Sequence, residues 1–268
     1  MFGVFIVRNF NFIIGFLYNV IFFEHPFNEH IRAYLRLEYL FDRLLFAINS
    51  NDIRLHQLAV SSFFDIIDLI ERSDVKGAVL QDLEKQRLSL LRFREHNAVN
   101  QKALEDALTE IENISSRLAT SGRPGNILRD NEWLNSVRSK LLVYGCAAQS
   151  DMPSYHFWQH KPDEERKHDL LSWFSHISPL FDALKIVLDL LRESGEFSEC
   201  LAEKEGYRQM LGGKIYQLLR VGIDKRSGVF PEISANKHMI WIRFSLQDAN
   251  FKSKYVKENI LFEMALCK

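Results

Sequence analysis

Residues 28–48 read NEHIRAYLRLEYLFDRLLFAI, and this stretch decides the fold of the first half of the chain. Its apolar residues recur at spacings of three and four, and they include Ile31, Tyr34, Leu35, Phe41, Leu45 and Ile48. Such spacing collects apolar side chains on one face of an α-helix, and Asn28 is a residue type that caps helix N-termini. The stretch therefore predicts one long amphipathic helix.

The same helical pattern continues beyond this first helix. Asp52 is a suitable cap for the second helix, and the turn Ser121-Gly122-Arg123-Pro124-Gly125 ends the fourth. The further predicted helices cover residues 53–70, 75–95, 99–119 and 127–142. We expect helices 75–95 and 99–119 to form an antiparallel hairpin that projects as an arm or pairs with a second subunit. The first two helices are the other candidates for a dimer surface.

The chain changes character near Gly122. Residues 24–121 contain one glycine and one proline, whereas residues 122–268 contain nine glycines and five prolines. After this change the pattern predicts two helices, at residues 163–178 and 179–194, and then strands at residues 239–244 and 260–264. The Gly-Gly pair within residues 211–214 suggests a tight hairpin connection.

The predicted fold class is therefore α+β. A mainly α-helical N-terminal domain, residues 21–141, is followed by a smaller β-rich domain, and residues 142–268 comprise two helices and this domain. Residues 1–20 are set apart as an extension.

Residues 1–23 hold seven of the 21 phenylalanines of the chain. Arg8 and three asparagines interrupt this segment, so it is too short an apolar run for a confident membrane span, which needs about 20 residues. No small-residue cleavage site follows it, as a secretory signal would require. Three interpretations remain: translation upstream of the true start, an anchor at a membrane interface, or a structured arm.

Charge and cysteine content indicate a cytoplasmic protein without a general affinity for nucleic acid. The 34 Lys and Arg against 35 Asp and Glu leave a net charge of -1, so electrostatic recognition must be local. Residues 197–268 carry 12 basic and 8 acidic residues, and residues 142–196 carry 5 and 9. The three cysteines have neither disulfide-framework nor metal-ligand spacing.

The chain lacks the common motifs of catalysis. His156 and His160 have the spacing of a zincin pair, but Phe157 stands where the glutamate belongs. If this segment is a strand, His156, Trp158 and His160 share one face, an arrangement more typical of packing or ligand contact than of a metal. Gly213-Lys214 lacks the other residues of a phosphate-binding loop. We therefore predict neither an enzyme nor a cofactor.

Arg32, Arg36 and Arg43 are separated by four and seven residues, which places them on one side of the first helix. Glu29 is the only acidic residue close to them on that side. Two interpretations are open: a solvated helix face, or guanidinium groups that line a groove for an acidic peptide.

Several short motifs follow one another along the chain. The series begins with Phe23-Glu24-His25-Pro26-Phe27-Asn28-Glu29 and Arg36-Leu37-Glu38-Tyr39-Leu40. It continues through Leu69-Ile70-Glu71-Arg72, Asp151-Met152-Pro153, His156-Phe157-Trp158, Val187-Leu188-Asp189-Leu190, Tyr216, Pro231, Ile233, Ile242-Arg243-Phe244 and Phe262-Glu263. In order and spacing these motifs resemble the ZapD family of bacterial cell-division proteins over about residues 21–267, and residues 1–20 lie outside the resemblance.

The resemblance implies a symmetric homodimer that binds the C-terminal tail of FtsZ, the tubulin-like GTPase of the division ring, and thereby bundles filaments. It implies no catalysis, no cofactor, and a place in the cytoplasm at the mid-cell ring. The tail-binding residues of the family match Arg36, Arg72, His156 and Arg243, with Arg129 and Lys237 as less certain neighbours. Glu132 and Met239 stand where relatives can be basic, which leaves the edges of the site open.

A second hypothesis is a membrane-surface adaptor whose aromatic N-terminus inserts at the interface while the folded body binds a partner. If the protein instead binds the FtsZ tail, we expect no stable membrane insertion and no nucleic-acid partner.

Overall fold

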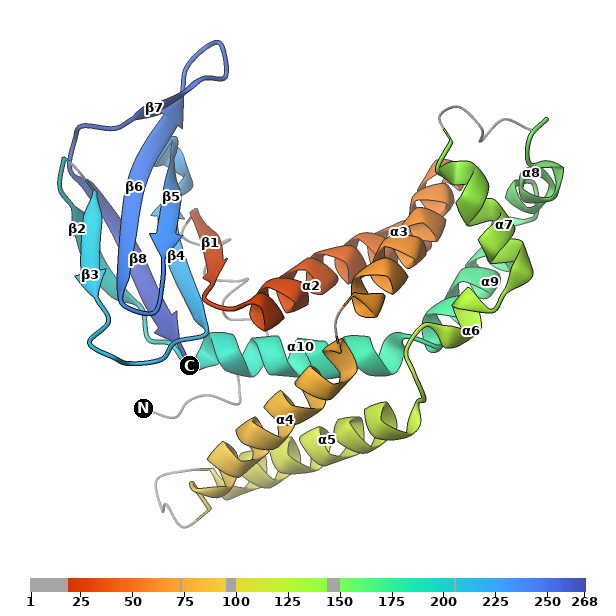
Figure 1. Cartoon of the computed structure of the whole chain (residues 1–268), viewed down its shortest axis with the longest axis horizontal. Coiled ribbons are helices and arrows are strands. Elements are labelled where there is room, and N and C mark those ends of the chain that lie inside the picture. Colours follow the sequence, from red (N-terminus) through yellow and green to blue (C-terminus); the bar gives the residue numbers. More distant parts are fainter. Residues whose placement is uncertain (1–18, 73, 95–99, 144–149, 205) are drawn as a thin grey trace. The chain divides into compact units, whose positions relative to one another are not determined.

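The computed structural model describes residues 19–72, 74–94, 100–143, 150–204 and 206–268 (Figure 1). They divide into two compact units, which we call the helical unit and the sheet unit. The helical unit is Ala33–Val187, and the sheet unit joins the residues up to Arg32 with Leu188–Lys268. The predicted α+β class, with helices first and strands at the end, is confirmed.

The helices account for nearly all regular structure between residues 29 and 193. They are α2 (Glu29–Ile48), α3 (Ile53–Glu71), α4 (Val75–Leu91), α5 (Gln101–Thr120), α6 (Asn126–Arg129), α7 (Glu132–Leu141), α8 (Pro153–Gln159), α9 (Asp163–Ser175) and α10 (Ser178–Glu193). Helices α2 and α10 cross the boundary between the two units.

Most predicted helices are confirmed, but the one expected over residues 127–142 is divided into α6 and α7. The break has a local cause. The side-chain oxygen of Asn131 accepts a hydrogen bond from the Leu134 N–H at 2.9 Å, which is the contact of an N-cap. Asp130 ends α6, so a new helix starts two residues later.

The core of the helical unit follows the predicted face of α2 only in part: Tyr34 and Ile48 are buried as expected, but Leu35 and Leu45 are only partly buried, and Leu37 and Leu44, which were not predicted, are buried instead. Leu37, Phe41 and Leu44 of α2 are fully buried. The Phe41 ring lies 5.2 Å from the Phe181 ring of α10, and each such buried side chain contributes about 1.5–3 kcal/mol. A separate aromatic cluster joins α7, α8 and α9 through Trp133, Tyr155, Trp158 and Trp173.

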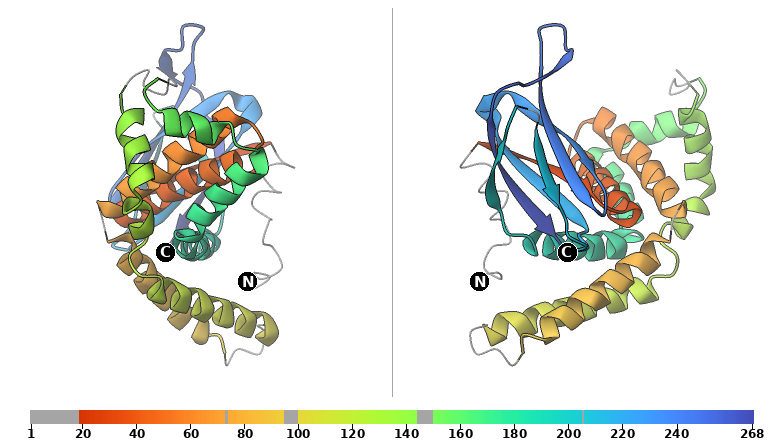
Figure 2. Two further views of the ribbon diagram at one scale, coloured as in Figure 1. Left: turned by 90° about the vertical axis from the view of Figure 1, so that its right-hand side faces the viewer. Right: turned by 60° about the vertical axis from the view of Figure 1, so that its left-hand side comes forward.

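Helices α4 and α5 form the predicted antiparallel hairpin, and both views in Figure 2 show them side by side. At one end of the hairpin Arg94 pairs with Glu105 at 2.8 Å. At the other end the Lys76 ammonium donates to the carbonyls of Ala119 and Gly122, at 3.0 and 2.7 Å. These contacts hold both ends of the hairpin in register.

The sheet unit contains two antiparallel sheets. The first has the strand order β1-β4-β8-β2, and the second β3-β6-β5, with β7 also paired to β6. Their bounds are β1 (Val20–Pro26), β2 (Ser198–Ala202), β3 (Tyr207–Met210), β4 (Leu218–Asp224), β5 (Val229–Ala235), β6 (Met239–Gln247), β7 (Ser253–Tyr255) and β8 (Ile260–Cys267). The strands predicted at 239–244 and 260–264 are confirmed as β6 and β8.

One apolar core joins the two sheets. It contains Val221 and Phe262 from the first sheet together with Ile242 and Phe244 from the second, all buried. Strand β1, which the sequence analysis did not predict, pairs with β4 and places Phe23 opposite Val221. It thereby draws residues 20–26 into the sheet unit, although the sequence analysis grouped residues 21–141 as helical.

The tight hairpin connection predicted at residues 211–214 is wrong. Residues 211–214 do not close a hairpin, because the strands on either side, β3 and β4, belong to different sheets. Gly212 and Gly213 adopt φ values of +59° and +78°, which suit a chain that turns from one sheet to the other. The segment around His156 is the helix α8 rather than a strand, with Pro153 in its first turn and Tyr155 and Trp158 buried three residues apart.

The predictions for residues 1–18 and for Cys146 lie outside the described residues. No described helix is long and apolar enough to cross a bilayer.

A buried ion cluster holds β1 in the sheet unit. The Glu24 carboxylate accepts two hydrogen bonds from Arg192, both 2.8 Å long, and one of 3.1 Å from Arg220. The Arg220 guanidinium also lies 5.1 Å from the ring centres of Phe22 and Phe197. Burial alone would raise the pKa of Glu24, but the hydrogen bonds and charges of Arg192 and Arg220 outweigh it and lower that pKa.

We predict that Glu24→Gln destabilises the protein by about 3 kcal/mol at pH 7, because two partly buried guanidiniums lose their counter-charge. The lowered pKa means that Glu24 stabilises the fold above about pH 4.5 and that this contribution is lost as the pH falls below it. Urea unfolding followed by circular dichroism at pH 7 and pH 4 measures both effects. Equal stability of wild type and Glu24→Gln at pH 7 would contradict this role.

Candidate functional site

The site follows from the way in which β6 is paired. Strand β5 occupies one edge of β6, so β3 and β7 must share the other edge. Strand β3 pairs with residues 239–242 and β7 pairs with residues 245–247. Arg243 and Phe244 therefore lie at a gap between two short strands.

The chain comes close to β6 on both sides of this gap. After β7, the Val256 N–H donates to the Phe244 carbonyl at 2.9 Å. Before β3, Gly206 has a φ of +107°, and a Cβ at that position would lie only 2.4 Å from the Ile242 carbonyl oxygen. Position 206 therefore requires glycine.

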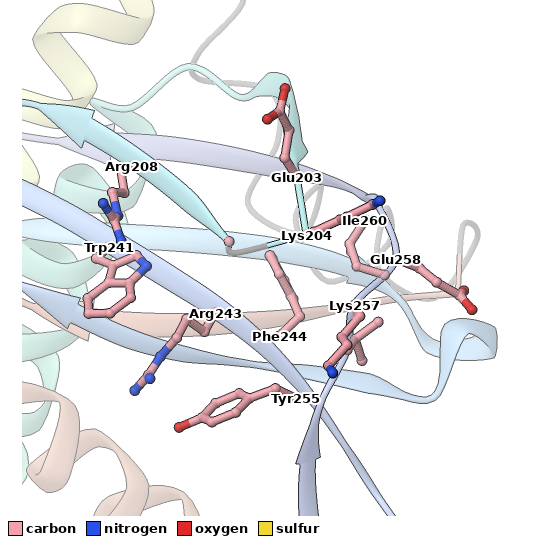
Figure 3. Close-up of a pocket in the computed structure, with 12 residues that line it drawn as sticks. Glu203, Lys204, Arg208, Trp241, Arg243, Phe244, Tyr255, Lys257, Glu258 and Ile260 are labelled. Atoms are coloured by element: carbon pink, nitrogen blue, oxygen red, sulfur yellow. The ribbon is translucent and has the colours of Figure 1, made fainter.

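A hollow of about 290 Å³ lies at the gap (Figure 3). Phe244, Val256 and Ile260 supply its apolar lining. The charged residues of the lining include four basic and two acidic ones: Lys204, Arg208, Arg243, Lys257, Glu203 and Glu258. The hollow is therefore apolar inside and mainly cationic around its edge.

Arginine and aromatic side chains alternate along one side of the hollow, as Figure 3 shows. The Arg208 guanidinium lies 4.8 Å from the centre of the Trp241 indole, directly opposite it in the strand register. The Arg243 guanidinium lies 4.6 Å from the centres of both the Trp241 and Tyr255 rings. We call these four residues the guanidinium–aromatic row. Each such contact contributes about 0.5–1 kcal/mol at an exposed site and fixes the orientation of the cation.

Within the described part of the chain, the guanidinium groups of the row donate no hydrogen bond to a protein acceptor. Arg243 forms a long ion pair with Glu232, which lies opposite it on β5, but their nitrogen–oxygen distance of 3.9 Å is beyond hydrogen-bond distance. Glu232 is itself held by a 2.7 Å hydrogen bond from the Ser245 hydroxyl. Arg208 is exposed and has no ion pair within the described part of the chain. Two oriented guanidinium groups with free donors suit a carboxylate.

Arg243 is the predicted site residue that the structure places in this row. Lys237 is exposed in the turn between β5 and β6. Lys237 and Arg243 are the two predicted site residues that lie in the sheet unit.

The other four predicted residues lie in the helical unit. Arg36 is exposed on α2, and Arg72 is exposed at the C-terminal end of α3. Arg129 pairs at 2.6 Å with Glu71, the residue that precedes Arg72 in the sequence.

His156 lies on α8, and its ring centre is 4.4 Å from that of His160. The described contacts do not join His156 or Arg36 to Arg72 or Arg129.

The three-arginine face of α2 is only partly available. Arg32 pairs with Glu29 at 3.1 Å, and Arg43 donates to Ser62 and to Asp65 of α3. Arg36 is the member of the three without an ion pair in the described structure.

Sequence reasoning missed Arg208, Trp241 and Tyr255. The spacing of Trp241 and Arg243 on a predicted strand gave one usable signal, because residues i and i+2 share a face. Arg208 comes from β3, which lies far from β6 in the sequence, and Tyr255 lies on β7, which follows β6 closely but is a strand of only three residues, too short for an apolar pattern.

The fold and this surface define an α+β protein in which an antiparallel sandwich presents a cationic, aromatic-lined hollow. Among the described residues, no three His, Cys, Asp or Glu side chains gather as a metal site.

Comparison with known proteins identifies the family. A family model described as the cell division protein ZapD matches residues 35–243. The cell division protein ZapD of Bordetella pertussis is 56% identical over 249 residues, which cover 93% of this chain and 98% of the relative. The cell division proteins ZapD of Janthinobacterium sp. and Ralstonia pickettii are 43% and 42% identical to this chain. Each match covers 92% of this chain and 99% of the relative. The chain therefore belongs to the ZapD family, and this membership supports a role in cell division.

We predict that Gly206→Ala destabilises the sheet unit by about 1–3 kcal/mol, because the new Cβ meets the Ile242 carbonyl and alanine disfavours this φ. Gly212→Ala is the matched control, since Gly212 also has a positive φ but has no atoms within 4 Å of an added Cβ. Thermal unfolding of both variants measures the difference. If Gly206→Ala is no less stable than Gly212→Ala, this result would contradict the close approach of Gly206 to the Ile242 carbonyl of β6.

Proposed function

We propose that this protein is a non-enzymatic cell-division factor that binds the C-terminal tail of FtsZ. In this proposal it acts in the cytoplasm as a homodimer, joins neighbouring filaments into bundles and stabilises the division ring at mid-cell. Membership of the ZapD family supports the cell-division role. The tail, the dimer and the bundling rest on the family resemblance of the sequence and on the chemistry of the site.

The observation that carries the proposal is the Arg243 guanidinium, which is held between two rings but has no hydrogen-bond acceptor among the described residues. Such a group is preorganised for a carboxylate, because the stacking fixes its plane before the ligand arrives. Its side chain is 39% exposed, so a peptide can reach it. Acidic residues of a flexible tail would supply the carboxylate.

The remaining proposed tail-binding residues receive unequal support. Arg36, Arg72 and Lys237 are exposed, as contact with a partner requires. His156 is half-buried beside His160. Arg129 would have to share or release Glu71 before it could bind a second carboxylate.

Weak single contacts are consistent with bundling if the protein is a dimer. A disordered tail loses conformational entropy when it is bound, which limits the affinity of one site. A polymer presents tails in rows, so a dimer with one tail bound meets the next tail at a high effective concentration. The exposed charge contacts also make bundling sensitive to salt, because the Debye length falls from about 10 Å at 0.1 M to about 3 Å at 1 M.

We predict that Arg243→Glu abolishes bundling of FtsZ filaments while the protein stays folded. The substitution replaces the carboxylate-binding group by a carboxylate that repels the tail. Lys225→Glu is the matched control: Lys225 is exposed in the same unit and lies outside the hollow, and the change in net charge is identical. Low-speed sedimentation of FtsZ polymer with each variant measures bundling, and circular dichroism checks the fold.

The same assay with tailless FtsZ tests the partner site. We expect wild-type protein to pellet intact polymer but not tailless polymer. Equal pelleting of the two polymers, or wild-type bundling by a folded Arg243→Glu variant, would contradict the proposed function.

A further inference from the structure

The hollow beside the guanidinium–aromatic row has an apolar lining that a carboxylate alone would leave uncovered. Val256 and Ile260 are half-buried and supply the accessible part of this lining, whereas Phe244 is only 4% exposed. Figure 3 shows Phe244 and Ile260 beside the charged residues of the edge. Bare apolar surface in a concave site favours an apolar ligand group, because covering it removes it from water.

The size of the hollow limits what can fill it. Pockets for whole small molecules and cofactors have volumes of about 300–1,000 Å³. The hollow measures about 290 Å³, at the lower end of this range. This volume is sufficient for one large side chain, and the chemistry of the lining decides which ligand fits.

The charges at the edge indicate which kind of ligand carries that side chain. Lys204 and Lys257 join the two arginines of the row, against Glu203 and Glu258. A small anion would pair with the guanidiniums but leave the apolar lining exposed to water. A purely apolar ligand would cover the lining but leave the guanidiniums without an anion. An acidic peptide segment carries both chemistries on nearby residues.

We propose that the hollow receives one large apolar side chain of the bound peptide, beside a carboxylate that Arg243 and Arg208 hold. This inference rests on the proposed function and extends it, because it assigns Arg208, Phe244, Val256 and Ile260 to specificity. The occupant is an acidic segment of a partner protein, and on the proposed function this segment is the tail of FtsZ. Recognition then has two points, and charge alone does not select the partner.

The test uses the full chain and a fluorescent peptide with the sequence of the FtsZ C-terminal tail. Each apolar residue of the peptide is replaced by serine in turn, and binding is measured by fluorescence anisotropy. We expect one replacement to weaken binding about ten- to hundredfold, since burial of a large apolar side chain contributes that much. If no replacement changes the affinity by more than about twofold, the hollow does not bind an apolar side chain.

Ile260→Trp places a bulky ring at the hollow, and Leu261→Trp is the matched control at an adjacent position of β8 that is 65% exposed and outside the lining. With Leu261→Trp the sensitive peptide position should remain sensitive. With Ile260→Trp the unmodified peptide should bind about ten- to hundredfold more weakly than it binds the wild type. The serine-substituted peptide should bind Ile260→Trp with the same affinity as the unmodified peptide does, because the hollow is already filled. Thermal unfolding checks that both variants fold. Undiminished sensitivity in a folded Ile260→Trp variant would overturn the assignment.

The outcomes separate this inference from the proposed function. If the wild-type chain bundles FtsZ through its tail but binds every serine-substituted peptide as tightly as the unmodified one, the assignment of the hollow is wrong and the proposed function stands. If the chain neither binds the tail peptide nor bundles polymer, both fail.

Discussion

The pairing of β6 with three other strands is the constraint on which the site depends. Because β5 occupies one edge, β3 and β7 divide the other edge between them and leave Arg243 and Phe244 at a gap. The same pairing puts Arg208 opposite Trp241 and brings Tyr255 within 4.6 Å of Arg243. A slip of one residue in this register would turn Trp241 and Arg243 to the opposite face, so strand pairing and site geometry are inseparable.

The parts of the fold that sequence predicts are those set by local spacing. The apolar rhythm of α2 and of α5 identifies both helices, and Asp52 caps α3 as predicted. Failures occur where distant partners decide. Strand β1 becomes recognisable only beside β4, and its Glu24 is satisfied by arginines far along the chain. The division of the helix at Asn131 was readable in principle, since asparagine is a strong cap residue.

The candidate site shows the same division between local and distant information. Arg243 was identified from a resemblance in sequence, and the Trp241–Arg243 spacing marks one face of a strand. Its orientation, however, depends on rings and charges from β3 and β7 that no local pattern connects. The resemblance also named Arg36, Arg72, Arg129 and His156, which the structure places in the helical unit. Whether those residues bind the same tail is part of the proposed function. The row in the sheet unit is complete without them.

The central claim is that a guanidinium fork held between two aromatic rings, and not merely a positive charge, binds the acidic tail. Arg243→Lys separates these ideas, because lysine keeps the charge but lacks the planar fork. The most direct measurement is the affinity of this variant and of the wild type for the FtsZ tail peptide, by isothermal titration calorimetry at one salt concentration. The account predicts that Arg243→Lys binds about tenfold more weakly. Equal affinity of the two proteins would contradict it.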